Sequence, residues 1–399
     1  MRKSFKYRAV LNKETEAEAL RWLGLCQILY NVALEQRILL YQCHRKTFSA
    51  YDQNRQLPEL KKEFPEFKSV GSQVLENVLD RLHKAYQSFF RRIKHGETPG
   101  FPRFKAKHRY NSFTLRQAGW KLEGQNLYIR NVGRLKLNLH RPIEGKIKTV
   151  TIRLTPTEKW FVSFSCDKVV PKTYSHTAAK VGIDVGLKNF AVDSDGHVIE
   201  NPKFFNKSQK ILRRRQRKLS RCKKGSKQRG KARLLVAKAH EKISNQRLDF
   251  LHKTANYYVE NYDVIHIEAL RIDKMIKNKY LARSIADASW GKFFELLSFK
   301  AEEAGRTLVR VDPKDTSQTC SSCGRKTPKS LSIRVHKCKH CGLVLDRDLN
   351  AALNIKEARS GPSKRNVRHK PERVLRSCQR ELRDNATASI NKIPREPLF

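Results

Sequence analysis

The order of hydrophobic and polar residues predicts a strand and two long helices at the start of the chain. Residues 1–10 alternate apolar and polar side chains, as a strand does. Apolar residues then recur at helical spacing over 20–34 and again over 74–90, which predicts two amphipathic helices. A polar segment around 52–56 separates them, and the two prolines of 98–103 forbid further helix.

From there to about residue 170 the pattern is that of short strands separated by turn residues. A small antiparallel barrel or sheet, with a helical insertion near its start, fits this pattern. Residues 171–179 form a linker into a second module. The predicted strands are Ser112–Leu115, Leu127–Ile129, Leu135–Leu137, Lys148–Arg153 and Trp160–Ser165.

The second module mixes strands and helices, so the whole chain is predicted to be a multidomain protein of the α+β or α/β class. It opens with a three-stranded meander and ends in a helix, Leu349–Ala358. Beyond Ala358 the sequence is basic and without periodicity, which predicts a largely disordered tail. The other predicted elements are strands Val181–Val185, Asn189–Val192, His197–Ile199, Val264–Ile267 and Thr307–Val311 and the helix Ser289–Glu303.

Charge changes this picture most, because it identifies the class of partner. The 399 residues include 84 Lys and Arg against 38 Asp and Glu, a formal net charge of +46. Such an excess repels itself unless a polyanion neutralises it, which favours nucleic acid over a membrane surface. No apolar run approaches the ~20 residues of a membrane span, and scattered cysteines suit a reducing compartment, so we expect a cytoplasmic protein.

The strongest concentration of charge lies in residues 207–233, which contain fourteen Lys or Arg and no Asp or Glu. Sparse apolar positions predict one arm of a basic helical hairpin, whose return arm is Leu234–Tyr262. A solvated charged face is the simpler interpretation, but this density favours contact with a phosphate backbone. The residues expected to make it are Lys210, Arg213, Arg214, Arg215, Arg217, Lys218, Arg221, Lys223 and Lys224.

Three acidic motifs at the ends of apolar runs are the candidate catalytic chemistry. They contain Asp184, Glu268 and the pair Asp346 and Asp348. Carboxylates gathered from strand ends could bind two Mg²⁺ or Mn²⁺ ions for phosphodiester cleavage. Structural alternatives are that Asp184 closes a turn with Gly186, that Glu268 is an exposed strand end, and that Asp348 caps the helix that follows it.

Four cysteines precede the third acidic motif in two CxxC pairs separated by fourteen residues, with a glycine after each pair. Each CxxC turn directs two thiolates at one tetrahedral ion, so this spacing predicts a zinc ribbon. A complete set of four ligands leaves no open position, and the one Zn²⁺ is therefore expected to be structural. We expect His336 and His340 to be surface or phosphate-contacting residues. The ligands are Cys320, Cys323, Cys338 and Cys341.

These motifs, in this order, resemble the TnpB family, the OrfB-type proteins of bacterial insertion sequences related to type V CRISPR effectors. The resemblance covers roughly residues 1–357. It implies a RuvC-like nuclease of the RNase H fold in which Asp184, Glu268 and Asp348 bind metal, and so selects Asp348 over Asp346. The matching segments are Lys3–Arg8, Tyr30–Asn31, Gly100–Lys105, Gly182–Gly186, Ile267–Glu268, Ser289–Gly291, the four cysteines and Asp348–Ala352.

The resemblance also implies a domain layout. A β-barrel wedge domain is interrupted by a helical recognition insertion, and the nuclease domain is interrupted by the zinc ribbon. The expected bounds are 1–10 and 96–172 for the wedge, 11–95 for the insertion, 178–316 and 344–357 for the nuclease domain, 317–343 for the zinc ribbon and 358–399 for the basic tail.

The activity implied by the resemblance is RNA-guided cleavage of double-stranded DNA, directed by a guide RNA transcribed from the transposon end. An associated transposase of the same element is a further expected partner. Two other functions remain open on the residues alone: a DNA transposase that joins strands with the same metal centre, and a non-catalytic nucleic-acid-binding regulator. The complete set of acids speaks against the regulator.

Overall fold

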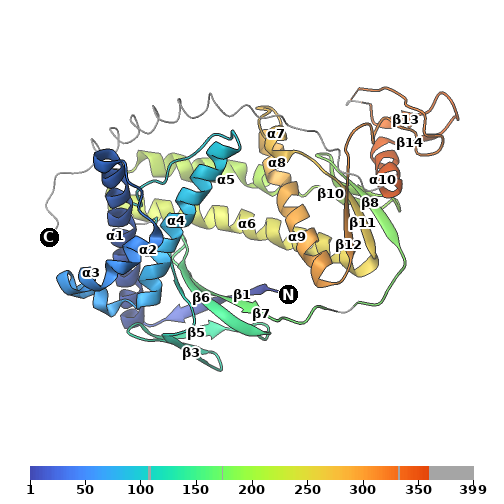
Figure 1. The fold of residues 1–399 in the computed structure, drawn as a ribbon. Coiled ribbons are helices and arrows are strands. Elements are labelled where there is room, and N and C mark those ends of the chain that lie inside the picture. Colours follow the sequence, from blue (N-terminus) through green and yellow to red (C-terminus); the bar gives the residue numbers. More distant parts are fainter. Residues whose placement is uncertain (107–108, 173, 331–332, 359–399) are drawn as a thin grey trace. The chain divides into compact units, whose positions relative to one another are not determined.

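The computed structural model describes residues 1–106, 109–172, 174–330 and 333–358. It is a mixed α/β protein whose described residues form two compact units, one ending at Val169 and the other beginning at Val170 (Figure 1). The predicted tail lies, beyond Ala358, outside the described residues. Among the described helices, none has the length and apolar character needed to cross a membrane.

The first unit contains a seven-stranded antiparallel sheet. Its order is β2-β6-β7-β1-β5-β4-β3, so β2 and β3 are end strands and the described hydrogen bonds form an open sheet rather than the closed barrel that was one expectation. Every predicted strand is present, and β3 is an addition. The bounds are β1 Lys3–Leu11, β2 Ser112–Leu115, β3 Trp120–Glu123, β4 Asn126–Ile129, β5 Gly133–Asn138, β6 Lys146–Leu154 and β7 Trp160–Asp167.

Two long helices, α1 (Lys13–His44) and α4 (Ser72–Lys94), lie side by side in this unit (Figure 1). Asn12 caps α1 directly after β1 by accepting a hydrogen bond from the Thr15 N–H, 2.9 Å away. The helices share one apolar core with the sheet, in which the rings of Trp22 and Phe113 are 5.4 Å apart. The two predicted helices are therefore confirmed, each longer than its apolar pattern indicated.

The polar segment between these helices is itself helical, which the sequence pattern did not predict. It forms α2 (Ala50–Arg55), α3 (Leu57–Glu63) and the 3-10 helix η1 (Pro65–Ser69). A reciprocal cap between Ser49 and Asp52 starts α2. Its polar Gln53 is buried and donates to the Ala33 carbonyl, so this polar residue lies in the packed interior and is satisfied there by a hydrogen bond.

The second unit contains a five-stranded sheet of order β10-β9-β8-β11-β12. Strands β8, β9 and β10 form the predicted antiparallel meander, whereas β11 pairs in parallel with both β8 and β12. Neighbouring parallel strands end at the same edge of a sheet. The bounds are β8 Lys180–Val185, β9 Asn189–Asp193, β10 Val198–Glu200, β11 Val264–Glu268 and β12 Thr307–Val311.

The predicted basic hairpin is present as α5 (Phe204–Arg221) and α6 (Lys227–Asn261), which pack side by side. The return arm begins at Lys227 rather than at the predicted Leu234. The turn comes earlier because Gly225 adopts φ 84° and Ser226 then caps α6. The remaining elements are α7 Ile272–Met275, α8 Ala282–Ala288, α9 Trp290–Glu303, β13 Val335–Lys337, β14 Val344–Asp346 and α10 Arg347–Glu357.

Candidate active site

One face of the second sheet is apolar and anchors the strands that carry the candidate acids. Side chains alternate between the two faces of a strand. Val181 and Ile183 of β8 therefore share a face with Ile265 and Ile267 of β11, and all four are buried in one core with side chains of α6 and α9, among them Phe293.

The opposite face carries Gly182 and Asp184 on β8 and His266 and Glu268 on β11, and α10 packs against both strands. At Gly182 the approach is so close that a Cβ atom there would overlap the Ala352 carbonyl oxygen and the Lys356 nitrogen of α10. The His266 ring nitrogen Nδ1 is 3.0 Å from the Ile355 carbonyl oxygen. Glycine is thus required in β8 because the helix backbone occupies the space of a side chain.

Strand register brings Asp184 and Glu268 together. Ile183 pairs with Ile267 in the parallel ladder, and the two acids are the next residues of their strands. Glu268 is 9% exposed and accepts a 2.6 Å hydrogen bond from the Thr316 hydroxyl, so its interpretation as an exposed strand end is wrong. The turn after β8 is closed by the Gly186 N–H bonding to the Phe190 carbonyl.

The electrostatic environment of Asp184 disfavours its negative charge. Burial, followed by the negative charges of Glu268 and Asp348, holds the pKa of Asp184 well above its usual range, and the nearby Arg347 lowers it only in part. Burial also raises the pKa of Glu268, against the hydrogen bond from Thr316 that lowers it. A carboxyl pair with raised pKa values at one sheet edge is the pattern of a functional site.

Asp348 joins this site from the first turn of α10. It is buried, and its carboxylate accepts hydrogen bonds from the guanidinium groups of Arg347, at 3.0 Å, and Arg334, at 3.2 Å. The helix cap is Asp346, whose side chain accepts from the Asp348 and Leu349 N–H groups at 2.8 and 3.3 Å. The interpretation of Asp348 as the helix cap is therefore wrong. The exposed Asp346 caps α10 instead.

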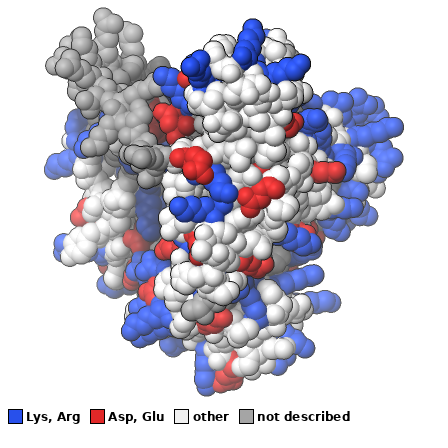
Figure 2. All heavy atoms as spheres, turned by 90° about the vertical axis from the view of Figure 1, so that its right-hand side faces the viewer, with Lys and Arg blue, Asp and Glu red and all other residues white. Residues whose placement is uncertain are grey.

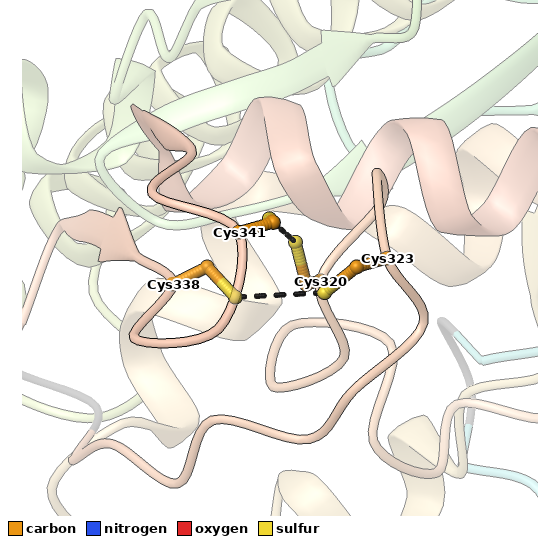
Figure 3. A group of neighbouring side chains, drawn as sticks. All are labelled: Cys320, Cys323, Cys338 and Cys341. Carbon is orange, nitrogen blue, oxygen red and sulfur yellow. Dashed lines mark hydrogen bonds between the residues drawn. The ribbon is translucent and has the colours of Figure 1, made fainter.

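The charges of Glu268 and Asp348 both act on Asp184, but the three carboxylates are not as tightly gathered as the cysteines. In the described part of the chain, the four cysteines are the one set of three or more possible metal ligands whose donor atoms all lie within 4.8 Å of one another. In Figure 3 the four side chains converge from two turns. The Sγ atoms of Cys320 and Cys341 are 3.6 Å apart, as are those of Cys323 and Cys338.

The two cysteine turns have the same backbone. In each, the glycine N–H donates to the carbonyl of the first cysteine, and Gly324 and Gly342 have φ values of 71° and 76°. Hydrogen bonds from the Cys341 and His340 N–H groups lower the pKa of the Cys338 thiol. Backbone donors aimed at sulfur are what a thiolate ligand needs.

α10 links the cysteine turns to the carboxylates. Asn350 is fully buried; its side-chain amide donates to the Thr319 carbonyl at 2.8 Å and its oxygen accepts from the Ser321 N–H at 3.0 Å, on either side of Cys320. Asn354 donates to the Thr316 carbonyl at 2.7 Å, and Thr316 in turn bonds Glu268. One helix therefore carries an acid and holds the loop that positions another.

The histidines near the cysteines differ from expectation. His336 is fully buried, not on the surface, and its Nδ1 atom is 2.5 Å from the Lys329 ammonium. Burial first, and the charge of Lys329 second, lower its pKa. His340 is exposed, with Nδ1 3.1 Å from Arg325. Neither histidine belongs to the metal-ligand set found among the described residues.

The basic hairpin presents its charge to solvent. Of the nine residues predicted to contact phosphates, Arg215 alone is half-buried; it donates to the Leu235 carbonyl at 2.9 Å, a bond that ties α5 to α6. One face of the molecule likewise shows more Lys and Arg than Asp and Glu (Figure 2). The predicted nucleic-acid-binding residues that are exposed are Lys210, Arg213, Arg214, Arg217, Lys218, Arg221, Lys223 and Lys224.

Sequence reasoning missed four residues that shape the site: Thr316, Arg334, Arg347 and Asn350. Arg347 and Asn350 flank Asp348 within the motif that had been singled out, so their position was a usable signal. Thr316 and Arg334 lie outside any acidic motif and reach the carboxylates only through the folded chain. No pattern of spacing identifies them.

Comparison with known proteins places the chain in a family. A profile described as "Probable transposase" (OrfB_IS605) matches residues 163–279, and one described as "Cas12f1-like, TNB domain" matches residues 290–355. A protein of Streptomyces pristinaespiralis described as "Putative RNA-guided DNA endonuclease" is 33% identical, over 98% of this chain and 99% of its own. The chain belongs to the TnpB (OrfB-type) family.

Other TnpB-family relatives agree. The Escherichia coli K12 protein described as "Putative RNA-guided DNA endonuclease InsQ" is 31% identical, over 88% of this chain and 91% of its own. Among solved structures, "Cryo-EM structure of the Cas12f1-sgRNA-target DNA complex" matches with a TM-score of 0.57 at 15% identity, covering 89% of this chain and 98% of that one. This likeness shows a shared fold.

One family description does not match the fold of this TnpB-family chain. A profile described as "Helix-turn-helix domain" matches residues 1–46. In the structure those residues form β1 and the single helix α1, which runs without a turn from Lys13 to His44. Residues 1–46 therefore do not form a helix-turn-helix motif with a separate recognition helix.

Proposed function

We propose that this chain is an RNA-guided DNA endonuclease that hydrolyses phosphodiester bonds at Asp184, Glu268 and Asp348. The main support is full-length similarity to a relative described by that activity. A second support is that acids on β11 and α10 act electrostatically on Asp184 of β8. The fold likeness to a Cas12f1 effector supports the same assignment.

The acids fit a divalent cation, Mg²⁺ or Mn²⁺. Their donor atoms are hard carboxylate oxygens, which these ions prefer. The raised pKa values of Asp184 and Glu268 mean that the site destabilises its own negative charge, which a cation would relieve. When bound, two such ions supply activation of water and stabilisation of the leaving oxygen.

The protein groups around the acids act as positioning residues. Thr316 fixes one oxygen of Glu268, and Arg334 with Arg347 fixes Asp348 while offsetting part of its charge. A carboxylate held by hydrogen bonds keeps a single orientation, which lowers the cost of ordering a ligand. Guanidinium groups beside the site also offer donors to a phosphate.

The cysteines fit one structural Zn²⁺. Four thiolates at a Zn–S distance of ~2.3 Å on a tetrahedron have sulfur atoms roughly 3.8 Å apart. The two Sγ–Sγ distances of 3.6 Å are close to that value. Because all four ligands come from protein, the ion would stabilise the fold rather than bind substrate.

The proposed domain layout assigns the antiparallel sheet, residues 1–10 and 96–172, to a wedge domain, with 11–95 as a recognition insertion. Residues 178–316 and 344–357 form a RuvC-like domain, and 317–343 a zinc ribbon. The mixed sheet supports the nuclease part of this layout, since the parallel strands β8 and β11 bring their acids to one edge.

Guide RNA and target double-stranded DNA are the proposed partners, and the eight exposed basic residues of the hairpin are the proposed phosphate contacts. Their side chains are solvent-exposed, which a backbone contact needs. Reading of sequence is assigned to base pairing, as in related guided effectors. An associated transposase of the same element is proposed as a partner on the family resemblance.

The deciding experiment compares RNA-loaded and RNA-free protein. We expect a supercoiled target to be cut in Mg²⁺ only when the protein carries its co-purified RNA, and we expect sequencing of that RNA to locate the guide. The RNA-free protein must be folded and monodisperse by light scattering for the comparison to count.

Two outcomes would favour the other functions. Strand-joined products from RNA-free protein would support the transposase named in the matching profile. Tight binding without cutting by RNA-loaded protein would support a regulator.

A further inference from the structure

Figure 1 labels the helices α7 and α8. The segment between them contains the most exposed tyrosine among the large exposed hydrophobic residues of the described chain. Tyr280 is 80% exposed, and it lies in a run of six consecutive exposed residues, 276–281. Ile276 and Leu281, at the two ends of the run, are each 44% exposed. Three large exposed side chains therefore lie within six residues of one another along the chain.

Packed residues and hydrogen bonds support the segment. Ile272 and Met275 pack against the core on one side, and Ile285 is buried on the other. Between them the Asn278 side chain accepts from the Tyr280 N–H at 3.0 Å, and the Asn278 carbonyl accepts from the Leu281 and Ala282 N–H groups. The turn thus holds the tyrosine outward at fixed geometry, with a packed support at both ends.

Charge identifies the kind of partner. From Arg271 to Arg283 the segment has five basic residues and one acid, Asp273, which is paired with Arg271. Lys277 and Lys279 have no acidic partner among the described residues, and the Lys279 ammonium lies 5.1 Å from the Tyr280 ring centroid. An exposed aromatic ring among unpaired cations is how proteins bind unpaired nucleotides.

Position relates this surface to the acids. Arg271, where the segment begins, follows Glu268 by three residues, so their Cα atoms are at most about 11 Å apart. The exposed 276–281 segment begins five residues after Arg271, so the chain that leaves the carboxylate site leads into this segment.

We propose that Tyr280 stacks on an unpaired base of the DNA strand to be cut, while Lys277 and Lys279 contact its phosphates. The proposal rests on the proposed function for the identity of the strand. In this proposal the 276–281 segment binds single-stranded DNA and guides the strand toward the carboxylate site. A protein partner is disfavoured because Lys277 and Lys279 lie between Ile276 and Tyr280 and make this segment basic rather than purely apolar.

The test measures stacking directly in full-length, RNA-loaded protein. Every protein compared, including the reference, carries Asp184→Asn. This substitution prevents cutting, so the DNA probe stays intact during the binding measurement. The probe is a short single-stranded DNA containing 2-aminopurine, whose fluorescence falls when it stacks. We expect Tyr280→Ala to weaken binding by about 5- to 160-fold, the range for loss of one stacked base, and to abolish the quench.

Two matched variants separate a ring from general apolar surface. Tyr280→Phe should keep both the affinity and the quench, whereas Tyr280→Leu, which folds with equal ease at an exposed site, should lose both. An abasic nucleotide at the stacked position should cost the wild type the same factor, and Tyr280→Ala should then add nothing further, as a double-mutant cycle requires.

Several results would overturn the proposal. One is equal quenching in wild type and Tyr280→Ala; another is retention of affinity by Tyr280→Leu, which would point to a protein-docking surface. A third is photocrosslinking of 4-thiothymidine DNA to peptides that exclude residues 276–281. Because none of these readouts requires cutting, they stay interpretable even if the chain proves not to cleave DNA.

Discussion

The cysteine cluster and the carboxylate site both contact α10, but they are assembled in different ways. The cysteines come from one segment and already converge, with pairs of sulfur atoms 3.6 Å apart. The acids come from β8, β11 and α10, and two of them, Glu268 and Asp348, have separate side-chain partners. The first site is closed by its own turns, whereas the second exists only when a helix docks on a sheet.

This difference implies that α10 has two structural roles. Through Asn350 the helix holds the cysteine turn, and through Gly182 it lies directly on β8. A ligand-free carboxylate site is electrostatically unfavourable, so its geometry has to be maintained from outside, by packing. Substitutions at Asn350 or Gly182 should therefore show whether a loss of DNA cutting is larger than the loss of folding stability explains.

The largest expected effect is on the acids themselves. Asp184→Asn, Glu268→Gln and Asp348→Asn should each lower the rate of DNA cutting by a factor on the order of 10³ or more, because each removes an ionic ligand worth several kcal/mol at the transition state. RNA and DNA affinity should stay within about twofold. Single-turnover cutting and filter binding on the same preparations measure the two quantities.

Stability supplies an independent readout of the same site. A raised pKa means that folded Asp184 holds a proton where the unfolded chain has lost it, so folding stability without Mg²⁺ falls as pH rises above the usual carboxyl range. Asp184→Asn should therefore unfold at higher urea than wild type, with a larger margin at pH 8 than at pH 5. An equal margin at both values would contradict the assignment of a raised pKa.

Loss of a cysteine should act on folding before chemistry. Cys320→Ser or Cys338→Ser removes a ligand from a closed site whose metal contributes folding free energy, so stability or solubility should fall sharply. Elemental analysis should give about one zinc per chain in wild type and much less in the variants. Cys43→Ser, at an exposed cysteine outside the cluster, is the matched control. Full nuclease activity in a zinc-free preparation would exclude a structural zinc.

Gly182→Ala tests the docking of α10. The added methyl group overlaps backbone atoms of Ala352 and Lys356, and overpacking of this kind costs about 1–3 kcal/mol. We expect reduced stability and a loss of cutting larger than the stability loss explains, because Asp348 moves with the helix. Urea unfolding and single-turnover cutting, measured together, check this.

Gly230→Ala is the control, since nothing lies within 4 Å of the position that its added methyl group would take on α6. Alanine in a helix interior is favoured over glycine by about 1 kcal/mol, so this variant should be as stable as wild type or more so. Equal behaviour of the two glycine variants would show that α10 is not fixed by the close approach at Gly182.

The two sites also differ in how much of them could be predicted from the sequence. The cysteine spacing is local, and a turn of fixed geometry follows from CxxC-Gly, so the cluster could be predicted from a short segment. The acids could be predicted as strand-end residues, but their support could not. Gln53, Thr316 and Arg334 are polar residues whose burial or partners arise from chain segments far away in sequence.

Asn350→Ala should have a moderate effect that reaches both sites. It leaves the Ser321 N–H and the Thr319 carbonyl without their partner, and a buried unpaired group costs about 1–3 kcal/mol. We expect faster release of zinc to a chelator and slower cutting in the zinc-loaded protein. Asn206→Ala, at an exposed position on α5, should change neither rate. Unchanged zinc release in Asn350→Ala would mean that α10 does not hold the cysteine turn.

The smallest expected effect, at Asp346, decides the identity of the third acid. Asp346→Ala removes the cap of α10 and should cost about 1 kcal/mol, with cutting reduced only a few-fold. Asp346→Ser keeps a capping oxygen but no carboxylate, so it should restore stability and cutting together if the residue acts only as a cap. A metal ligand would behave differently, because serine cannot replace a carboxylate there. The opposite result would be an inactive Asp346→Ser variant together with an Asp348→Asn variant that cuts normally. In that case Asp346 is the metal ligand, and α10 presents its acid from the cap position.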